Sequence, residues 1–194
     1  MDRARADAGG SERGGAATGV IDGKIYVAGG LRNGAGTTDV SIYDPLASTW
    51  TPAPPLPVAL DHACGASVGG KLYVVGGRAV NPGAPVATVY ELTPGGGWIE
   101  RAPMPTARGG AGCGVSDDRI VVAGGEGNPA AGSRGVFPQV EAYTPSQDTW
   151  ETLAPMPTPR HGLAAAAWDG RLYVAGGATV QGFGAVATHE ILTP

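Results

Sequence analysis

The sequence predicts an all-β fold made of four consecutive antiparallel sheets, each with four short strands. The first observation is compositional: the 194 residues include 34 glycines and 17 prolines, yet 42% of them are hydrophobic. Disorder needs low hydrophobicity and high charge, whereas many short strands joined by tight turns need this mixture. The second observation is an internal repeat, and the third is a set of proline and tryptophan marks that recur at the same spacing.

A Gly-Gly pair that follows a short apolar segment is the clearest mark of the repeat. The first glycine of each pair stands at position 29, 76, 124 or 176, so the spacings are 47, 48 and 52 residues. Prolines that end a later strand, tryptophans and proline-rich stretches recur with the pairs. These marks are Pro45, Pro94, Pro145 and Pro194; Trp50, Trp98 and Trp150; and the stretches 53–57, 102–105 and 154–157.

Each repeat contains four predicted strands, here named a to d in chain order. Strand a is small and apolar, as in 162–168, and a two-residue turn that favours positive φ follows it. Strand b, 24–28 and its equivalents, is almost uniformly apolar, which predicts burial on both faces. Strand d carries the tryptophan. The turns are Asp22-Gly23, Gly69-Gly70, Asp117-Asp118 and Asp169-Gly170, and strand c is expected at 39–43, 88–92, 139–143 and 188–192.

These residues resemble the kelch repeat, in which a tyrosine and then a tryptophan follow the Gly-Gly pair. Tyr43 and Trp50 fit this spacing, and Tyr143 and Trp150 fit it after a longer loop. Leucine replaces the tyrosine in the other two repeats. The resemblance covers residues 13–194 and implies a β-propeller with blades at about 13–57, 58–105, 106–157 and 158–194. Residues 1–12 are expected to form a disordered or weakly ordered tail.

The fourth repeat is incomplete, because its outer, tryptophan-bearing strand would lie near position 199 and the sequence ends at Pro194. Residues 1–12 hold no β-branched or aromatic residue, so they are not expected to replace that strand. The resemblance implies six or seven blades as the usual number. Four blades therefore predict either an open or partial propeller or a small self-assembling array, with self-association through open blade edges.

The loops between strands b and c vary most, and they share one end of the blades with the d–a loops. Variable loops on a rigid scaffold usually carry function, so we expect a binding face there. The longest of these loops contains Glu126, Arg134 and Phe137, which are candidate ligand contacts. The four loops are 31–38, 78–87, 126–138 and 178–187.

An arginine precedes the Gly-Gly pair by 16 residues in three blades, at Arg13, Arg108 and Arg160, and Leu60 takes its place in the second. The resemblance implies that such arginines line a pocket for an acidic ligand, since guanidinium groups suit carboxylates. In that case Arg108 and Arg160 share one pocket mouth. The alternative is that each arginine holds its own loop through backbone carbonyls.

His62 and His161 lie near the predicted channel mouth and complete the candidate ligand-binding set. Without a carboxylate cluster they predict no metal site and no cofactor, and no catalytic residue is assigned. The two cysteines, Cys64 and Cys113, stand 12 and 11 residues before their Gly-Gly pairs. A one-residue offset puts them on opposite faces of a strand, which favours buried free thiols over a disulfide.

The function expected from these features is a binding module for a protein segment or a small acidic or sugar ligand. The resemblance also leaves two alternatives. One is a fragment of a carbohydrate-active enzyme, either like sialic acid epimerases, with Arg108, Arg160, His161 and Glu126 over the channel, or like galactose oxidases. The other is a structural or non-functional partial propeller.

The charge and hydropathy patterns exclude other classes of partner. A net charge of −4 and a pI near 5.3 argue against nucleic acid and anionic membranes as partners. The sequence contains no apolar run long enough to span a bilayer and no signal-peptide pattern, so a cytoplasmic location is the default expectation.

Overall fold

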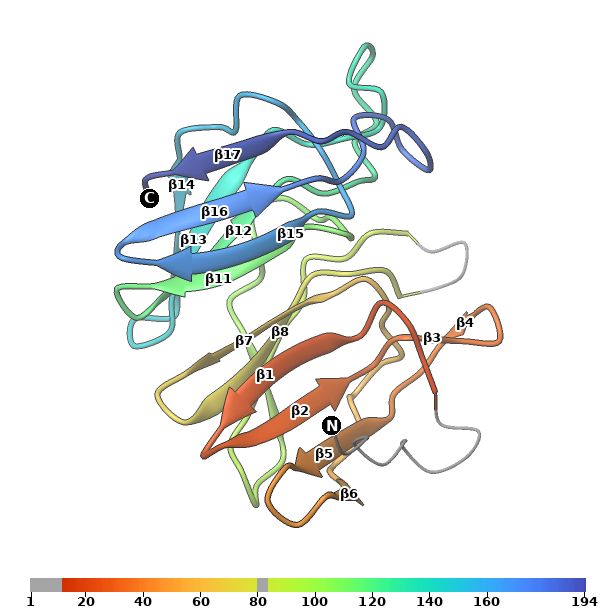
Figure 1. Cartoon of the computed structure of the whole chain (residues 1–194), viewed down its shortest axis with the longest axis vertical. Helices are drawn as coiled ribbons and strands as arrows, with labels where there is room; N and C mark the ends of the chain where they lie inside the picture. The colour runs from red at the N-terminus through yellow and green to blue at the C-terminus, as the bar shows by residue number, and fades with distance from the viewer. Residues whose placement is uncertain (1–11, 80–83) are drawn as a thin grey trace.

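The computed structural model describes residues 12–79 and 84–194, and every regular element in these residues is a β-strand (Figure 1). The predicted tail, residues 1–12, lies outside this part except for Glu12. Four antiparallel sheets form in chain order. Blade 1 contains β1 (Ala17–Ile21), β2 (Lys24–Ala28), β5 (Val40–Asp44) and β6 (Thr49–Pro52); blade 2 contains β7 (Cys64–Val68), β8 (Lys71–Val75), β9 (Val89–Leu92) and β10 (Trp98–Arg101).

The third and fourth sheets repeat this order, but the fourth has three strands, as its incomplete repeat predicts. A short hairpin of β3 (Leu31–Arg32) and β4 (Ala35–Gly36) stands in the first b–c loop. Within the described residues no helix is long and apolar enough to cross a membrane. Blade 3 contains β11 (Gly112–Ser116), β12 (Arg119–Ala123), β13 (Val140–Thr144) and β14 (Thr149–Leu153); blade 4 contains β15 (Ala164–Trp168), β16 (Arg171–Ala175) and β17 (His189–Leu192).

The turns and the strands that follow them form where the sequence predicts. Both residues of the first turn have positive φ, 50° at Asp22 and 74° at Gly23, and the other three turns share this conformation. Such turns match the right-handed twist of the strands that they join. Strand b has the same bounds as the prediction in each blade, whereas strand c begins one residue later than predicted.

The blades stack face to face in chain order, from blade 1 in the lower part of Figure 1 to blade 4 in the upper part. We call the side of each sheet that faces the next blade its forward face, and the other side its rear face. On β2, Tyr26 and Ala28 lie on the forward face, and Ile25 and Val27 lie on the rear face. In each of the three interfaces, the forward face of one blade packs on the rear face of the next.

The predicted burial of strand b on both faces holds only in the two middle blades. Strands β8 and β12 are buried along nearly their whole length, whereas β2 and β16 are buried on one side. Ile25 on the rear face of blade 1 is 36% exposed, and Trp168 on the forward face of blade 4 is 71% exposed. Among the described residues the four blades therefore form an open array, because none of the four sheets covers these two outer faces.

The tryptophans of strand d in blades 2 and 3 connect each of these blades to the preceding one. The Trp98 Nε1 donates a hydrogen bond to the Pro54 carbonyl oxygen of the preceding blade at 2.8 Å. The Trp150 Nε1 donates in the same way to the Ala102 carbonyl oxygen at 2.9 Å. The proline-rich stretch of one blade thus provides the acceptor for the tryptophan of the next.

Cys64 and Cys113 form a disulfide, so the expectation of free thiols is wrong. Their Cα atoms are 6.1 Å apart, within the usual range for a disulfide. Cys64 lies on the forward face of blade 2 and Cys113 on the rear face of blade 3. The one-residue offset does place them on opposite faces, but opposite faces of successive stacked sheets face each other. The same offset therefore brings the two sulfur atoms together.

Candidate functional site

At the loop end of the array, each d–a loop pairs with the b–c loop of its own blade. The residue after the repeated arginine position forms a β-bridge with the residue after the Gly-Gly pair. Because these positions are structurally equivalent but chemically different, they give each blade its own surface. We call this end the loop face; the four pairs are Gly14–Leu31, Asp61–Arg78, Gly109–Glu126 and His161–Ala178.

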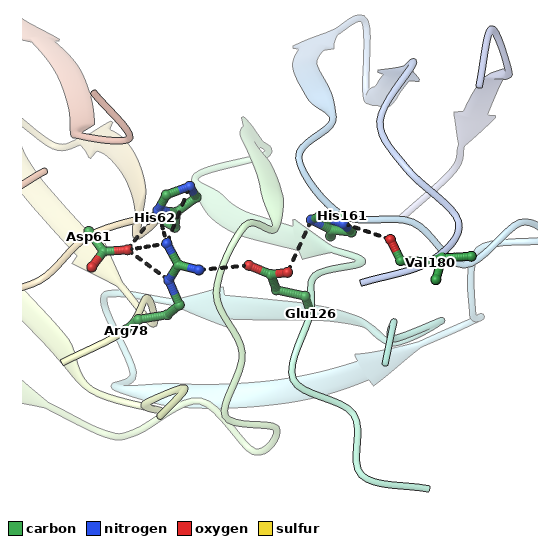
Figure 2. Close-up of polar contacts among 6 residues, drawn as sticks. All are labelled: Asp61, His62, Arg78, Glu126, His161 and Val180. Atoms are coloured by element: carbon green, nitrogen blue, oxygen red, sulfur yellow. Dashed lines mark hydrogen bonds and ion pairs between the residues drawn. The ribbon is translucent and has the colours of Figure 1, made fainter. Parts of the chain in front are cut away.

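Arg78 joins blades 2 and 3 at the centre of the loop face (Figure 2). Its Nε donates to the Asp61 Oδ1 at 2.7 Å, and its Nη1 donates to the Glu126 Oε1 at 3.2 Å. Asp61 and Glu126 are only 1% and 6% exposed. One guanidinium group therefore neutralises two buried carboxylates that belong to different blades.

His161 extends these contacts to blade 4, as Figure 2 shows. Its Nε2 donates to the Val180 carbonyl oxygen at 3.1 Å, which fixes the proton on that nitrogen. Its Nδ1 faces the Glu126 Oε2 at 3.4 Å. We call Asp61, His62, Arg78, Glu126 and His161 the mouth network, since it runs across three blades at the loop face.

His62 holds a backbone conformation that the other blades give to glycine. Its φ is 52°, and the equivalent Gly15, Gly110 and Gly162 have φ of 61°, 62° and 60°. A non-glycine residue costs free energy in this region, and such strain is often found at functional sites. The His62 N–H donates to the Gly15 carbonyl oxygen at 2.7 Å, and the His62 carbonyl accepts from the Gly110 N–H at 2.8 Å. The backbone thus holds the ring at the centre of the loop face.

The His62 ring contacts Asp61 and Arg78, the two other residues of the mouth network that belong to blade 2. Its Nδ1 lies 2.6 Å from the Asp61 Oδ1 and 2.7 Å from the Arg78 Nη2. This nitrogen either donates to the carboxylate or accepts from the guanidinium group, so one proton position couples the three side chains. The other ring nitrogen, Nε2, is not part of the bond to Asp61 and lies 3.5 Å from the Arg78 Nη2.

Gly109 makes room for Arg78 to cross between blades. A Cβ atom at Gly109 would lie 2.9 Å from the Arg78 Cγ. The equivalent positions in blades 2 and 4 carry Asp61 and His161, whose side chains are part of the network. The glycine in blade 3 is therefore required by the path of the arginine, and its φ is not in the left-handed region.

The repeated arginines point into their own blades. Arg160 is fully buried; it donates to the carbonyl oxygens of Gly176 and Thr158, and it pairs with the Glu190 carboxylate at 2.8 Å. Arg13 donates to the Gly29 carbonyl oxygen at 2.7 Å and also contacts Val27. The alternative stated above, that each arginine holds its own loop through backbone carbonyls, agrees with these bonds.

Arg108 makes the same kind of contacts in blade 3. It is 1% exposed, donates to the Val122 carbonyl oxygen at 3.1 Å, and pairs with the buried Glu141 carboxylate. Burial lowers the pKa of Arg108, and the Glu141 carboxylate counters this effect. Arg108 and Arg160 therefore do not share a pocket mouth, because their charges are already satisfied inside separate blades.

The longest b–c loop forms one wall of a pocket of about 500 Å³ between blades 3 and 4. Arg134 is exposed there, and its carbonyl oxygen accepts a hydrogen bond from the Gln181 N–H at 2.9 Å. Phe137 is 6% exposed and packs inside the loop. The lining includes Asn128, Ser133, Arg134, Val136, Thr158 and Thr179.

The structure adds Asp61 and Arg78 to the candidate residues and brings them together with His62, Glu126 and His161. A signal for both was present in the sequence: they occupy repeated positions where blade 1 has Gly14 and Leu31. In the described part of the chain, no group of three His, Cys, Asp or Glu side chains is arranged to hold a metal ion.

Comparison with known proteins places these observations in a family. The model of the kelch motif matches residues 12–57 and 107–157. These two segments correspond to blades 1 and 3, which carry both the tyrosine and the tryptophan of the repeat. A solved structure titled "Structure of YjhT" aligns with a TM-score of 0.70 at 17% identity, over 97% of this chain and 83% of the other. At that identity the likeness concerns the fold alone.

Curated relatives agree with this match. The chain is 37% identical over 182 residues to the kelch-like protein terF of Aspergillus terreus, an alignment that covers 89% of this chain and 39% of the relative. It is 28% identical over 163 residues to kelch-like protein 35 of Mus musculus, covering 84% of this chain and 26% of that protein. The chain thus spans well under half the length of these relatives. With the four repeated sheets described above, these matches show that the chain belongs to the kelch-repeat family.

Proposed function

We propose that this chain is a binding module that engages an acidic segment of a partner protein at the mouth network. The observation that carries the proposal is that the network's carboxylates are buried while its nitrogen-bearing side chains are partly exposed. The carboxylate side chains of Asp61 and Glu126 are only 2% and 8% exposed, whereas His62 and Arg78 are 36% and 23% exposed. A ligand on the loop face therefore meets the guanidinium group of Arg78, which can only donate hydrogen bonds, and the ligand must supply acceptors.

Carboxylate groups are the acceptors that this arrangement suits best. A bond between a guanidinium or imidazole donor and a carboxylate is charge-assisted and stronger than a neutral one. The two buried carboxylates hold Arg78 in place before any ligand arrives, so little side-chain entropy is lost on binding. Partly exposed charges of this kind give specificity and fast association, and their effect falls as salt rises.

The adjoining pocket extends the proposed site beyond a single carboxylate. Thr179 lines the pocket, and the next residue, Val180, accepts the hydrogen bond from His161. The exposed Arg134 on the pocket wall offers a second cation. A peptide segment with two acidic side chains would contact both places, which supports a protein segment over a small acidic or sugar ligand.

The test is fluorescence anisotropy with a labelled glutamate-containing peptide and a matched peptide in which glutamine replaces each glutamate. We expect the acidic peptide to bind and the glutamine peptide to bind at least about tenfold more weakly, a difference of about 1.4 kcal/mol. Competition by free glutamate at low concentration would instead indicate a small-ligand site. Equal binding of the two peptides would overturn the proposal.

His62→Gly is a matched variant for this test. Glycine occupies the equivalent position in the other three blades at similar positive φ, so the substitution removes the ring and relieves strain. We expect it to weaken acidic-peptide binding about tenfold while the unfolding temperature stays the same or rises slightly. Unchanged peptide affinity in both His62→Gly and Arg78→Gln would show that the mouth network is not the site.

The enzyme alternative receives less support from the geometry. Its epimerase form relied on Arg108, Arg160, His161 and Glu126 over one channel. Of these, only Glu126 and His161 meet, at 3.4 Å, while both arginines are bound within their blades. The binding function therefore remains the proposal.

A further inference from the structure

Two sheet faces of the array are built like internal interfaces but have no blade against them in the described chain. They are the forward face of blade 4 and the rear face of blade 1. Blade 1 lies in the lower part of Figure 1 and blade 4 in the upper part, so these are the two outermost blades of the array. The three internal interfaces show what normally covers such faces, which makes a direct comparison possible.

The forward face of blade 4 carries the same residue classes as the forward faces that are buried. Tyr173 is equivalent to Tyr26 and Tyr73, which are 6% and 2% exposed. Ala175 is exposed, but the equivalent Ala28 is 1% exposed. Trp168, 71% exposed, stands at the position of Ile21, which is 4% exposed in blade 1. The largest apolar side chain of the series is thus on the uncovered face.

The rear face of blade 1 matches the buried rear faces in the same way. Ile25 is 36% exposed, whereas its equivalents Leu72, Ile120 and Leu172 are fully buried. Val20 on the neighbouring strand is 60% exposed. Blade 1 therefore retains the apolar surface that, in blades 2 to 4, packs against a forward face.

We propose that a second copy of this chain docks head to tail, with the forward face of blade 4 packed on the rear face of blade 1 of the other copy. The argument rests on continuity with an existing interface, since the same two faces already pair three times within the chain. An interface between two different surfaces either closes into a ring or grows without limit. Two copies of the described four-blade array supply eight blades, within the range of about four to eight found among β-propellers in general, and three copies would exceed that range.

The internal interfaces also predict which side chains meet. Tyr73 on a forward face and Tyr143 on a rear face lie edge to face, with ring centroids 6.0 Å apart. The equivalent residues at the ends of the array are Tyr173 and Tyr43. In the proposed dimer Tyr173 of one copy packs on Tyr43 of the second copy. Trp168 becomes buried beside them, and buried tryptophans contribute strongly to interfaces.

The chain's own disulfide provides the design of the decisive experiment. Cys64 pairs in register with Val75, as Ala164 pairs with Ala175; Cys113 pairs with Val122, as Thr18 pairs with Val27. Cysteines placed at 18 and 164 would therefore face each other across the docked surfaces as Cys64 and Cys113 do within the chain. Both positions are exposed in the single chain, so neither substitution disturbs packing.

Purified Thr18→Cys and Ala164→Cys chains are mixed, oxidised mildly and separated on a non-reducing gel. We expect a disulfide-linked dimer that contains one chain of each kind, with little product from either variant alone. Ala165→Cys is the matched control, because a one-residue shift turns the thiol to the buried face. Efficient crosslinking of Ala165→Cys, or of Thr18→Cys with itself, would overturn the head-to-tail arrangement.

Light scattering on the unmodified chain gives an independent result. We expect a species of twice the 19.3 kDa chain mass that dissociates on dilution. Trp168→Ala is expected to raise the dissociation constant at least tenfold and to leave acidic-peptide binding unchanged. A monomer at every concentration, or larger open polymers, would overturn the proposal. Neither outcome depends on whether the mouth network binds peptides, so the two proposals fail separately.

Discussion

Arg108 and Arg78 are arginines of neighbouring blades that the structure uses in opposite ways. Arg108 stands at a repeated position, is 1% exposed, and directs its charge to Glu141 and backbone carbonyls of its own blade. Arg78 stands at a position that is leucine in blade 1 and alanine in blade 4, and its side chain is 23% exposed. It crosses to the next blade and keeps part of its surface open.

This difference separates scaffold from site. A charged residue that recurs in several blades serves an internal need that every blade has, such as satisfying the carbonyls at the end of strand b. A charged residue that replaces glycine, leucine or alanine in one blade serves no such common need. Buried polar contacts are therefore expected to affect stability, and the mouth network is expected to affect binding.

The largest effect is expected from Arg108→Met. The Glu141 carboxylate, 2% exposed, would lose its ion-pair partner and keep the Thr106 hydroxyl as a donor at 2.7 Å. Breaking a buried ion pair in this way typically costs about 3–5 kcal/mol. Urea denaturation measures the loss, and the double variant Arg108→Met with Glu141→Gln is expected to recover part of it. A loss below about 1 kcal/mol, near the value for exposed ion pairs, would show that this arginine is not part of the scaffold.

The second effect tests the Cys64–Cys113 link between blades 2 and 3. Cys64→Ser with Cys113→Ser opens a bridge between residues 49 positions apart. Such bridges typically contribute about 2–4 kcal/mol, chiefly by restricting the unfolded chain. Calorimetry is expected to show a lower unfolding temperature in the variant, and the reduced wild-type chain is expected to match it. If reductant leaves the wild-type unfolding temperature unchanged, the bridge does not form in solution.

A pH-dependent effect of similar size is expected from Glu91, a buried carboxylate near the same interface. Burial acts to raise the pKa of Glu91, but hydrogen bonds from Arg101, Lys71 and Tyr73 outweigh it and hold the pKa at about 2. The pKa is lower in the folded chain than in the unfolded chain. The carboxylate therefore stabilises the fold fully above about pH 4.5, and this contribution is lost as the pH falls toward 2.

Each pKa unit corresponds to about 1.4 kcal/mol, and the pKa of Glu91 falls from 4.5 to about 2 on folding, so the full loss is on the order of 3 kcal/mol. Urea denaturation of the wild type and of Glu91→Gln, repeated between about pH 5 and pH 2, gives the free energy of unfolding at each pH. The loss from Glu91 is the amount by which this free energy falls more steeply with pH in the wild type than in the variant. Parallel pH profiles for the two chains would contradict the role of Glu91. At a pH where both chains are folded, we expect the wild type and Glu91→Gln to bind the acidic peptide with the same affinity.

The smallest effect on stability, but a clear effect on binding, is expected from Gly109→Ala. The added Cβ would lie 2.9 Å from the Arg78 Cγ, so the arginine must move away from Glu126. We expect a stability loss of about 1 kcal/mol and at least about fivefold weaker acidic-peptide binding. Gly14→Ala is the control at the equivalent position of blade 1, where nothing lies within 4 Å of the new atom. Equal peptide affinity in the two variants would mean that the position of Arg78 does not control binding.

The sequence by itself determined the repeat, the number of blades, the bounds of strand b and the positive-φ turns. Each of these depends on local rules, because a two-residue turn such as Asp22-Gly23 and an apolar run ending in glycines specify their own backbone. The three strands of the fourth described sheet were predicted from the same marks. The variable loops and the candidates His62, His161 and Glu126 could also be placed near one end of the blades from strand direction alone.

Only the tertiary structure decided which of these residues meet and which face they present. Cys64 and Cys113 form a bridge because opposite faces of successive sheets are in contact, a relation between blades that no single strand contains. The direction of Arg108 depended on the Glu141 carboxylate and the backbone carbonyls that folding brings within its reach. Arg78 joined the site because a glycine in the next blade leaves its path open. Short stretches of sequence determine the local backbone conformation, whereas contacts between blades depend on how complete sheets stack.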